Sequence, residues 1–348
     1  MICKLLSAAL LKEQGDRLKS TDLFSVDLLV RQKMTKKPRY IEIDGIPCSS
    51  IDVPEVYRDA MRFKPGKGDT VIVTYPKCGT TWLLQIVSLI LRKGEPLVTY
   101  KEYFSYIPFL ERTTVKELSQ MPKPRLMKTH LSIDRLNFSS EAKYIYVARH
   151  PADCVVSYYH HTRLFPTYFF TRGKLDDFFE LFLTGEVAFG DYFDHLLAGY
   201  LLRNEPNVLF LTFESLLSNP RDICLKVARF MGEEHYNNLM ADDEVILKKV
   251  LEYSSMKFMK STVNDFWMRK FTDVPSQEAQ DANPVMRNVA KFLKEAEDLG
   301  EESTGVFFRS GVGGEGKATL SAEQLERLRS RILEKTKNSD VMTLWEEN

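Results

Sequence analysis

The sequence predicts an α/β fold: one domain with a central, mostly parallel β-sheet flanked by helices on both faces. Short runs rich in β-branched and aromatic residues, such as 71–74, 143–148 and 207–212, have the composition of buried strands. Segments with helical spacing of their apolar residues separate these runs. Strands that alternate with helices are typical of a parallel sheet. No internal repeat and no long linker argues for a second domain.

Length, charge and cysteine content limit the class of protein. The chain has 348 residues, of which 44% are hydrophobic, and its 48 basic and 48 acidic residues cancel. No global field therefore favours nucleic acid or an anionic membrane as a partner. Five scattered cysteines without a C-x-x-C pair fit a reducing compartment, and no stretch reaches the roughly 18 apolar residues of a membrane span. We expect a cytoplasmic protein with an N-terminal extension (1–39) and a folded domain (40–340).

The first strand of the sheet leads into a tight turn and a helix. Residues 40–69 are rich in turns and precede the β-branched run 71–74. Pro76 ends this strand because proline has no N–H for a central ladder. Gly79 permits a sharp turn and a close backbone approach to a ligand, and an apolar helix is expected over 83–91.

This strand, turn and helix predict a phosphate or sulfate site. Such a turn directs free backbone N–H groups and the positive end of the helix dipole to one point. Lys77 adds a charge, and Thr80 and Thr81 add hydroxyl donors. The turn is not a Walker A loop, because its lysine precedes its only glycine. An ordinary strand-to-helix turn is the alternative interpretation.

An aromatic segment follows over 97–111. Its rings, Phe104 and Phe109 among them, either pack a loop or form the wall of an acceptor pocket. Thr114 and Glu117 have the spacing of a capping box for a short helix.

Two further strands bring basic residues to the carboxyl edge of the sheet, where ligands bind in open α/β folds. The strand 126–128 ends in Lys128 and is followed by His130, although a lone histidine is usually structural. The strand 143–148 runs into Arg149, and Ser157 lies two helical turns further on. Arginine suits a phosphate because its planar fork binds two oxygens, although a surface ion pair is the alternative for Arg149.

The second half of the chain continues the alternation of helices and strands. Amphipathic helices are expected over 176–184 and 191–203, and a capped helix over 220–231. The charged segment 277–300 has helical spacing and is expected to be a solvated surface insertion rather than a lid over the pocket. Ser321 and Gln324 predict a capping box for the last helix.

The motif Tyr75–Trp82 (YPKCGTTW) resembles the 5′-phosphosulfate loop of the cytosolic sulfotransferases, whose usual form is YPKSGTTW. Three further elements resemble motifs of the family and occur in the same order along the chain. They are Lys128-Thr129-His130, the Arg149/Ser157 pair, and 253–260 with 309–317. The resemblance covers about residues 45 to 335. The family usually has other residues where this chain has Phe213, Met256, Ser310, Glu315 and Gly316.

The resemblance implies a P-loop-like sulfotransferase fold that uses 3′-phosphoadenosine 5′-phosphosulfate (PAPS, with product PAP). Because the basic residues can do what a metal does in kinases and no group of carboxylates is placed to bind one, we predict no metal. It implies that His130 is the general base, that Lys77 stabilises the leaving phosphate oxygen and that Lys128 neutralises the sulfuryl oxygens. The residues it assigns to the nucleotide are Lys77, Cys78, Gly79, Thr80, Thr81, Trp82, Arg149, Ser157, Phe213, Ser254, Met256, Arg309, Ser310 and Gly311.

The acceptor is expected to be a small molecule with a hydroxyl or amine: a phenol, a catechol-type amine or a steroid-like alcohol. The residues expected to line its apolar pocket are Phe104, Phe109, Tyr168 and Phe169. Two other classes stay open: a catalytically weak, sulfotransferase-like carrier of nucleotide or small ligand, and a P-loop-type nucleotide kinase. The family's dimer strip is incomplete, with only Lys317 and Glu326 retained, so a homodimer also stays open.

Overall fold

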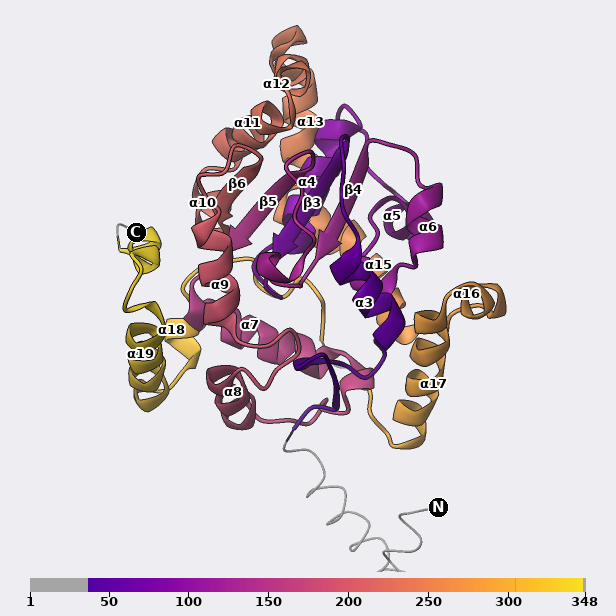
Figure 1. The fold of residues 1–348 in the computed structure, drawn as a ribbon, viewed down its shortest axis with the longest axis vertical. Coiled ribbons are helices and arrows are strands. Elements are labelled where there is room, and N and C mark those ends of the chain that lie inside the picture. Colours follow the sequence, from indigo (N-terminus) through magenta and orange to yellow (C-terminus); the bar gives the residue numbers. More distant parts are fainter. Residues whose placement is uncertain (1–36, 304, 347–348) are drawn as a thin grey trace, which may run out of the picture.

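The structure is a computed structural model that describes residues 37–303 and 305–346 (Figure 1). Its main sheet has four parallel strands in the order β4-β3-β5-β6, which confirms the predicted α/β fold. Their bounds are β3 Asp69–Thr74, β4 Arg125–Thr129, β5 Lys143–Ala148 and β6 Val208–Thr212. Of the predicted N-terminal extension (1–39), residues 1–36 lie outside the described part of the chain.

An α-helix follows each of β3, β5 and β6, whereas only a short 3-10 helix (Ile133–Arg135) lies between β4 and β5. The helices up to β6 are α3 Pro54–Arg62, α4 Thr80–Leu91, α5 Tyr100–Tyr106, α6 Val115–Gln120, α7 Pro151–Leu164, α8 Leu175–Thr184 and α9 Tyr192–Leu201. Those after β6 are α10 Phe213–Ser218, α11 Pro220–Met231, α12 Glu233–Met240, α13 Val245–Tyr253, α14 Met256–Phe258, α15 Asn264–Thr272, α16 Gln277–Ala282, α17 Pro284–Asp298, α18 Glu315–Thr319 and α19 Ala322–Thr336. The predicted capping boxes at the start of α6 and α19 are confirmed.

The two faces of the sheet belong to two different apolar cores, because side chains alternate along a strand. Val71 and Val73 of β3 pack in one core with residues of α7, α8 and α9. Ile72, between them, packs in the other core with residues of α4, α11, α13 and α15. β3 is buried along its whole length, as expected for the centre of a parallel sheet. Its carboxyl end is therefore fixed in position by helices on both sides.

A hairpin precedes the main sheet where the sequence analysis expected only turns. β1 (Tyr40–Ile43) and β2 (Ile46–Ser49) pair antiparallel. Asp44 and Gly45 connect them, with φ of 52° and 78°. Asp-Gly between β-branched residues is a strong hairpin pattern, because both turn positions need a positive φ.

The segment 277–300 also differs from the expectation of a solvated insertion. Val285, Val289 and Leu293 of α17 form a third apolar cluster with Ile51 and Val56. In Figure 1, α16 and α17 lie on the opposite side of the molecule from α18 and α19. The helical spacing was correct, but sequence alone does not reveal which surface receives an apolar stripe.

The C-terminal packing extends beyond residue 340. Val341 is buried, and the indole N–H of Trp345 donates to Glu214 at 2.8 Å. In the described part of the chain, no helix has both the length and the apolar character needed to span a membrane.

Candidate functional site

The turn between β3 and α4 has the backbone geometry of an anion-binding loop. Lys77 and Gly79 both have positive φ, 71° and 96°. Gly79 is the N-cap of α4, and no side chain caps the first N–H groups of that helix. A Cβ at Gly79 would lie 2.8 Å from the ring of Phe213, so this position needs glycine for both conformation and space. The first-turn N–H groups can therefore serve a ligand.

His130 is oriented from the end of β3. Its Nδ1 lies 2.8 Å from the carbonyl oxygen of Thr74, which can only accept, so Nδ1 carries the proton and Nε2 is the free acceptor. The rings of Phe109 and Phe189 pack edge-on against the imidazole. Burial, and then the charge of Lys128, hold the pKa of His130 well below its usual range. The side chain is thus a neutral base with a defined tautomer.

A buried carboxylate fixes the backbone around His130. One oxygen of Glu111, Oε1, accepts from Thr129 Oγ1 at 2.9 Å, from the His130 N–H at 2.7 Å and from the Leu131 N–H at 3.0 Å. Burial raises the pKa of Glu111 to about 7. Sequence analysis did not single out Glu111. A single acidic residue in an aromatic segment gives no sign that its side chain will bind the backbone of a turn 19 residues away.

Lys77 is a partly buried cation next to a histidine that sequence analysis missed. Its Nζ lies 3.3 Å from His161 Nδ1 and 4.4 Å from the centre of the Phe307 ring. Burial, together with the nearby charge of Arg149, lowers the pKa of Lys77 to about 7. A bound anion would favour the charged form of this lysine.

Lys128 lies between two aromatic rings. Its Nζ is 4.4 Å from the centre of the Phe109 ring and 4.5 Å from that of Trp267. Burial, and then the charge of Lys270, lower its pKa well below the usual lysine range. Trp267 belongs to α15, so a helix that sequence analysis did not single out contributes to the wall of the site.

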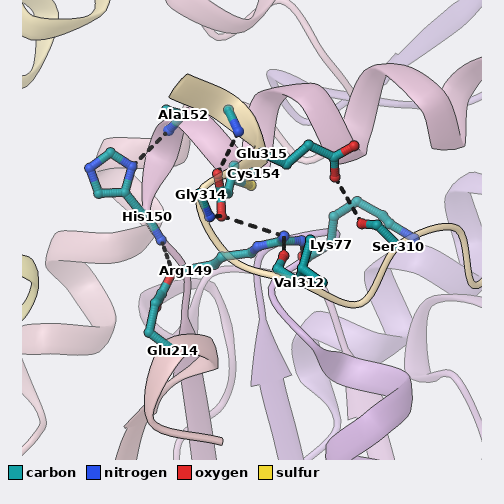
Figure 2. A network of polar contacts seen from close by, with 12 residues as sticks. Lys77, Arg149, His150, Ala152, Cys154, Glu214, Ser310, Val312, Gly314 and Glu315 are labelled. Carbon is teal, nitrogen blue, oxygen red and sulfur yellow. Dashed lines mark hydrogen bonds and ion pairs between the residues drawn. The ribbon is translucent and has the colours of Figure 1, made fainter. Parts of the chain in front are cut away.

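Arg149 is buried at the end of β5 and is the centre of the network in Figure 2. It donates to the carbonyl oxygens of Lys77 at 3.2 Å and Val312 at 3.3 Å, and it lies 3.7 Å from Asp153. Its Nε is buried and has no partner among the described residues. A buried guanidinium with one unused donor fits a phosphate ligand.

The loop 309–317 is attached to the start of α7 through Asp153. This carboxylate accepts from the backbone N–H groups of Gly314 at 2.8 Å and Gly316 at 2.6 Å. The family usually has another residue where this chain has Gly316. In this structure a Cβ at Gly316 would lie 2.2 Å from the backbone of Ala152, so a larger residue would clash with the start of α7.

Arg309 and Ser310 of this loop both bond to Glu315. Arg309 pairs with one carboxylate oxygen of Glu315. Ser310 Oγ donates to the other oxygen at 2.8 Å, as Figure 2 shows. A phosphate at this loop would therefore have to compete with Glu315 for Arg309. Gly311, with φ of 73°, allows the loop to pass close to Met256.

Trp82 is held by a main-chain contact from a distant segment. Its indole N–H donates to the carbonyl oxygen of Ser254 at 2.8 Å, and its ring meets the ring of Phe213 edge-on. Ser254 itself does not line the cavity, so its contact with the site runs through Trp82. Phe213 also lies under Arg149, whose guanidinium carbon is 4.2 Å from the ring centre.

One cavity of about 910 Å³ brings most of the predicted site residues together. The predicted residues that line it are Lys77, Gly79, Thr80, Thr81, Trp82, Phe104, Phe109, Lys128, His130, Arg149, Ser157, Tyr168, Phe213, Met256, Arg309, Ser310 and Gly311. Glu111 is not part of this lining, whereas His161, Phe189, Trp267 and Lys270, which sequence analysis also missed, are.

Besides Ser254, two predicted residues do not line the cavity with their side chains. Phe169 is absent from the cavity lining, because its ring packs against Phe292 and under the guanidinium of Arg39. Cys78 turns its side chain into the core, with Sγ 3.9 Å from Cys154 Sγ, so only its backbone can face a ligand. No cluster of three or more His, Cys, Asp or Glu side chains suited to a metal occurs within residues 37–303 and 305–346.

Comparison with known proteins gives one consistent result. A family model described as "Sulfotransferase domain" matches residues 67–340. The mouse protein "Sulfotransferase 1 family member D1" is 29% identical over 318 residues, which cover 86% of this chain and 94% of that protein. Human "Sulfotransferase 1C2" is 32% identical over 268 residues, covering 68% and 88%. The structure of mouse sulfotransferase SULT7A1 complexed with PAP superposes with a TM-score of 0.63 at 25% identity, covering 88% and 98%.

Proposed function

Because this chain belongs to the sulfotransferase family, we propose that it transfers a sulfuryl group from PAPS to a hydroxyl or amine of a small aromatic acceptor, with His130 as the general base. The observation that carries the proposal is that Lys77, Lys128 and His130 line one and the same cavity, together with an aromatic wall. The cavity volume of about 910 Å³ is ample for a small acceptor beside a nucleotide.

The proposed base is His130 Nε2. Because Nδ1 donates to the Thr74 carbonyl, the neutral ring presents an unprotonated Nε2. The depressed pKa of His130 keeps the ring neutral at physiological pH. Nε2 can then take the proton of an acceptor hydroxyl as its oxygen attacks. The aromatic contacts of the imidazole hold its plane and restrict its rotation.

The residues present fit the donor nucleotide. When bound, PAPS supplies an activated sulfuryl group. The unpartnered Nε of Arg149 and the uncapped N–H groups of α4 are the donors that its phosphates need. We assign the 5′-phosphosulfate to the loop 77–82 and the 3′-phosphate to Arg149, Ser157 and the loop 309–311. Trp82, Phe213 and Met256 would hold the adenine, with Ser254 positioning Trp82.

The two lysines are assigned to the charge that develops during transfer. We propose that Lys77 stabilises the leaving phosphate oxygen and that Lys128 neutralises the oxygens of the sulfuryl group. Both lysines have lowered pKa values in the protein alone, and an anion beside them would restore their protonation. Neutral His130 therefore sits among cations that stabilise anionic groups.

The test separates binding from chemistry in two variants. His130→Ala should abolish sulfation of 2-naphthol while PAP affinity, measured by calorimetry, stays near that of the parent protein. Arg149→Ala should weaken PAP binding by about 100-fold, because it removes charge-assisted hydrogen bonds of about 1.5–3 kcal/mol. A His130 variant that keeps its turnover would contradict the assignment of the base, and unchanged PAP affinity in the Arg149 variant would contradict the 3′-phosphate site.

The pairing of Arg309 with Glu315 favours a second candidate, the catalytically weak carrier of nucleotide or small ligand. PAP binding without turnover on any acceptor would support this alternative. Action in the cytoplasm, a small-molecule acceptor without nucleic acid or membrane, and assembly as a homodimer stay predictions from the family resemblance.

A further inference from the structure

Lys270 is a cation on the cavity wall without a counter-ion. It lies near the end of α15, is partly buried, and places Nζ 4.0 Å from the centre of the Phe104 ring. No carboxylate of the described residues lies within 4.0 Å of its nitrogen. The neighbouring Arg112, in contrast, is paired with Asp52 at 2.8 Å. Lys270 therefore presents to the cavity a charge that has no ion-pair partner among the described residues.

The acidic residues on the cavity wall do not supply the missing partner. Glu117 accepts from the N–H of Thr114 at 2.7 Å, from its hydroxyl at 2.8 Å and from Asn283 Nδ2 at 3.0 Å. Its carboxylate attracts Lys270 through space but forms no ion pair with it, and its Oε2 is engaged by the cap of α6 and by Asn283. Glu278, on α16, is exposed to solvent.

The position of Lys270 relates it to the proposed reaction centre. Trp267 and Lys270 are three residues apart on α15 and so lie on the same side of the helix, about 5 Å apart along its axis. Trp267 touches Lys128, which belongs to the proposed reaction centre with His130. Lys270 is therefore one helical turn further along the wall, beside Phe104.

We propose that Lys270 forms an anion subsite of the acceptor pocket and that the acceptor is an aromatic hydroxyl compound carrying a carboxylate. The hydroxyl faces His130, the ring packs against Phe104 and Phe109, and the carboxylate binds Lys270. The inference rests on the proposed function and narrows its acceptor class, because an ammonium group would meet a like charge here. Burial lowers the pKa of Lys270 to about 8, so a bound carboxylate also relieves the cost of its charge.

The test compares acceptors that share one phenol and differ only in charge. The three probes are 3-(4-hydroxyphenyl)propanoate, its uncharged amide and 4-(2-aminoethyl)phenol, each assayed for kcat/KM with PAPS. In the parent protein we expect kcat/KM to be highest for the carboxylate, lower for the amide and lowest for the ammonium compound. Lys270→Gln should lower the carboxylate-to-amide ratio by about 10- to 100-fold, the range for one hydrogen bond to a charged group. Lys270→Glu should invert the preference toward the ammonium compound.

A matched control is Arg269→Gln on the same helix. Arg269 is exposed and pairs with Asp273 at 3.2 Å, so this variant also loses one positive charge but not one that lines the cavity. Its carboxylate-to-amide ratio should equal that of the parent protein. Equal ratios in the parent protein and in both Lys270 variants would overturn the anion subsite. Absence of transfer to all three phenols, with PAP still bound, would instead contradict the proposed transfer activity.

Discussion

Replacement of Glu111 by alanine should both destabilise the fold and displace the proposed base. The substitution removes the one oxygen that accepts from Thr129, His130 and Leu131. The Leu131 N–H keeps a second acceptor, Thr129 Oγ1 at 3.0 Å, so two buried donors lose their partner. Each unsatisfied group costs about 1–3 kcal/mol, so the free energy of unfolding should fall by about 2–6 kcal/mol. At an m value of about 3 kcal/mol/M, the urea midpoint falls by about 1–2 M.

The matched control is Glu111→Gln, whose amide oxygen can accept the same three hydrogen bonds. This variant should unfold within about 1 kcal/mol of the parent protein and keep its turnover. Urea unfolding followed by tryptophan fluorescence, together with kcat at saturating PAPS, measures both effects. An alanine variant with the parent's midpoint and kcat would refute the role of Glu111 in fixing the turn. Equal losses in the glutamine and alanine variants would show that the negative charge, rather than the acceptor oxygen, matters.

Other predictions concern the loop, the buried histidines and the nucleotide. Gly79→Ala should abolish PAP binding measured by calorimetry, because its Cβ would lie 2.8 Å from the ring of Phe213. The control is Gly45→Ala, which also has a positive φ but has open space around it. This variant should lose only about 1–2 kcal/mol of stability and keep its PAP binding. His195 has its pKa lowered to about 4 by burial, so the unfolded state binds the extra proton and stability falls as pH drops from 6.5 to 4. In urea titrations between pH 6.5 and 4, the free energy of unfolding of His195→Asn should therefore fall by about 3 kcal/mol less than that of the parent protein. The same pH dependence in both proteins would contradict this role of His195. Glu315→Gln should free Arg309 and raise PAP affinity by about 2- to 5-fold, whereas a decrease would show that their pairing shapes the loop for the ligand.

The parts of the site predicted from sequence are those that local rules determine. The run 71–82 contains its own strand ending, turn glycine and helix start, so the loop could be read without any distant contact. His130 and Arg149 follow strands, and parallel strands bring their carboxyl ends to one edge.

The parts that sequence analysis missed depend on long-range contacts. Glu111 acts on a turn 19 residues away, and His161 meets Lys77 across 84 residues. Trp267 and Lys270 reach the cavity from α15, a helix for which sequence analysis predicted no contact with the site. Phe169 was expected in the pocket from its aromatic character, but its ring faces Arg39 instead. Residue type and helical spacing identify an apolar or charged face, but they do not say which partner it meets.

The concentration of buried positive charge in one cavity makes the donor nucleotide part of the protein's stability. Lys77, Lys128, Arg149 and Lys270 all line this cavity, and among the described residues only Arg149 has a carboxylate within 4 Å. The lowered pKa values of the three lysines, caused first by burial, mean that keeping them charged opposes folding in the absence of an anion. A polyanionic nucleotide supplies the missing counter-charge, and at 100 times its dissociation constant it adds about 2.7 kcal/mol to the folded state. The amount of folded protein in a cell would then follow the supply of the nucleotide as well as the rate of synthesis.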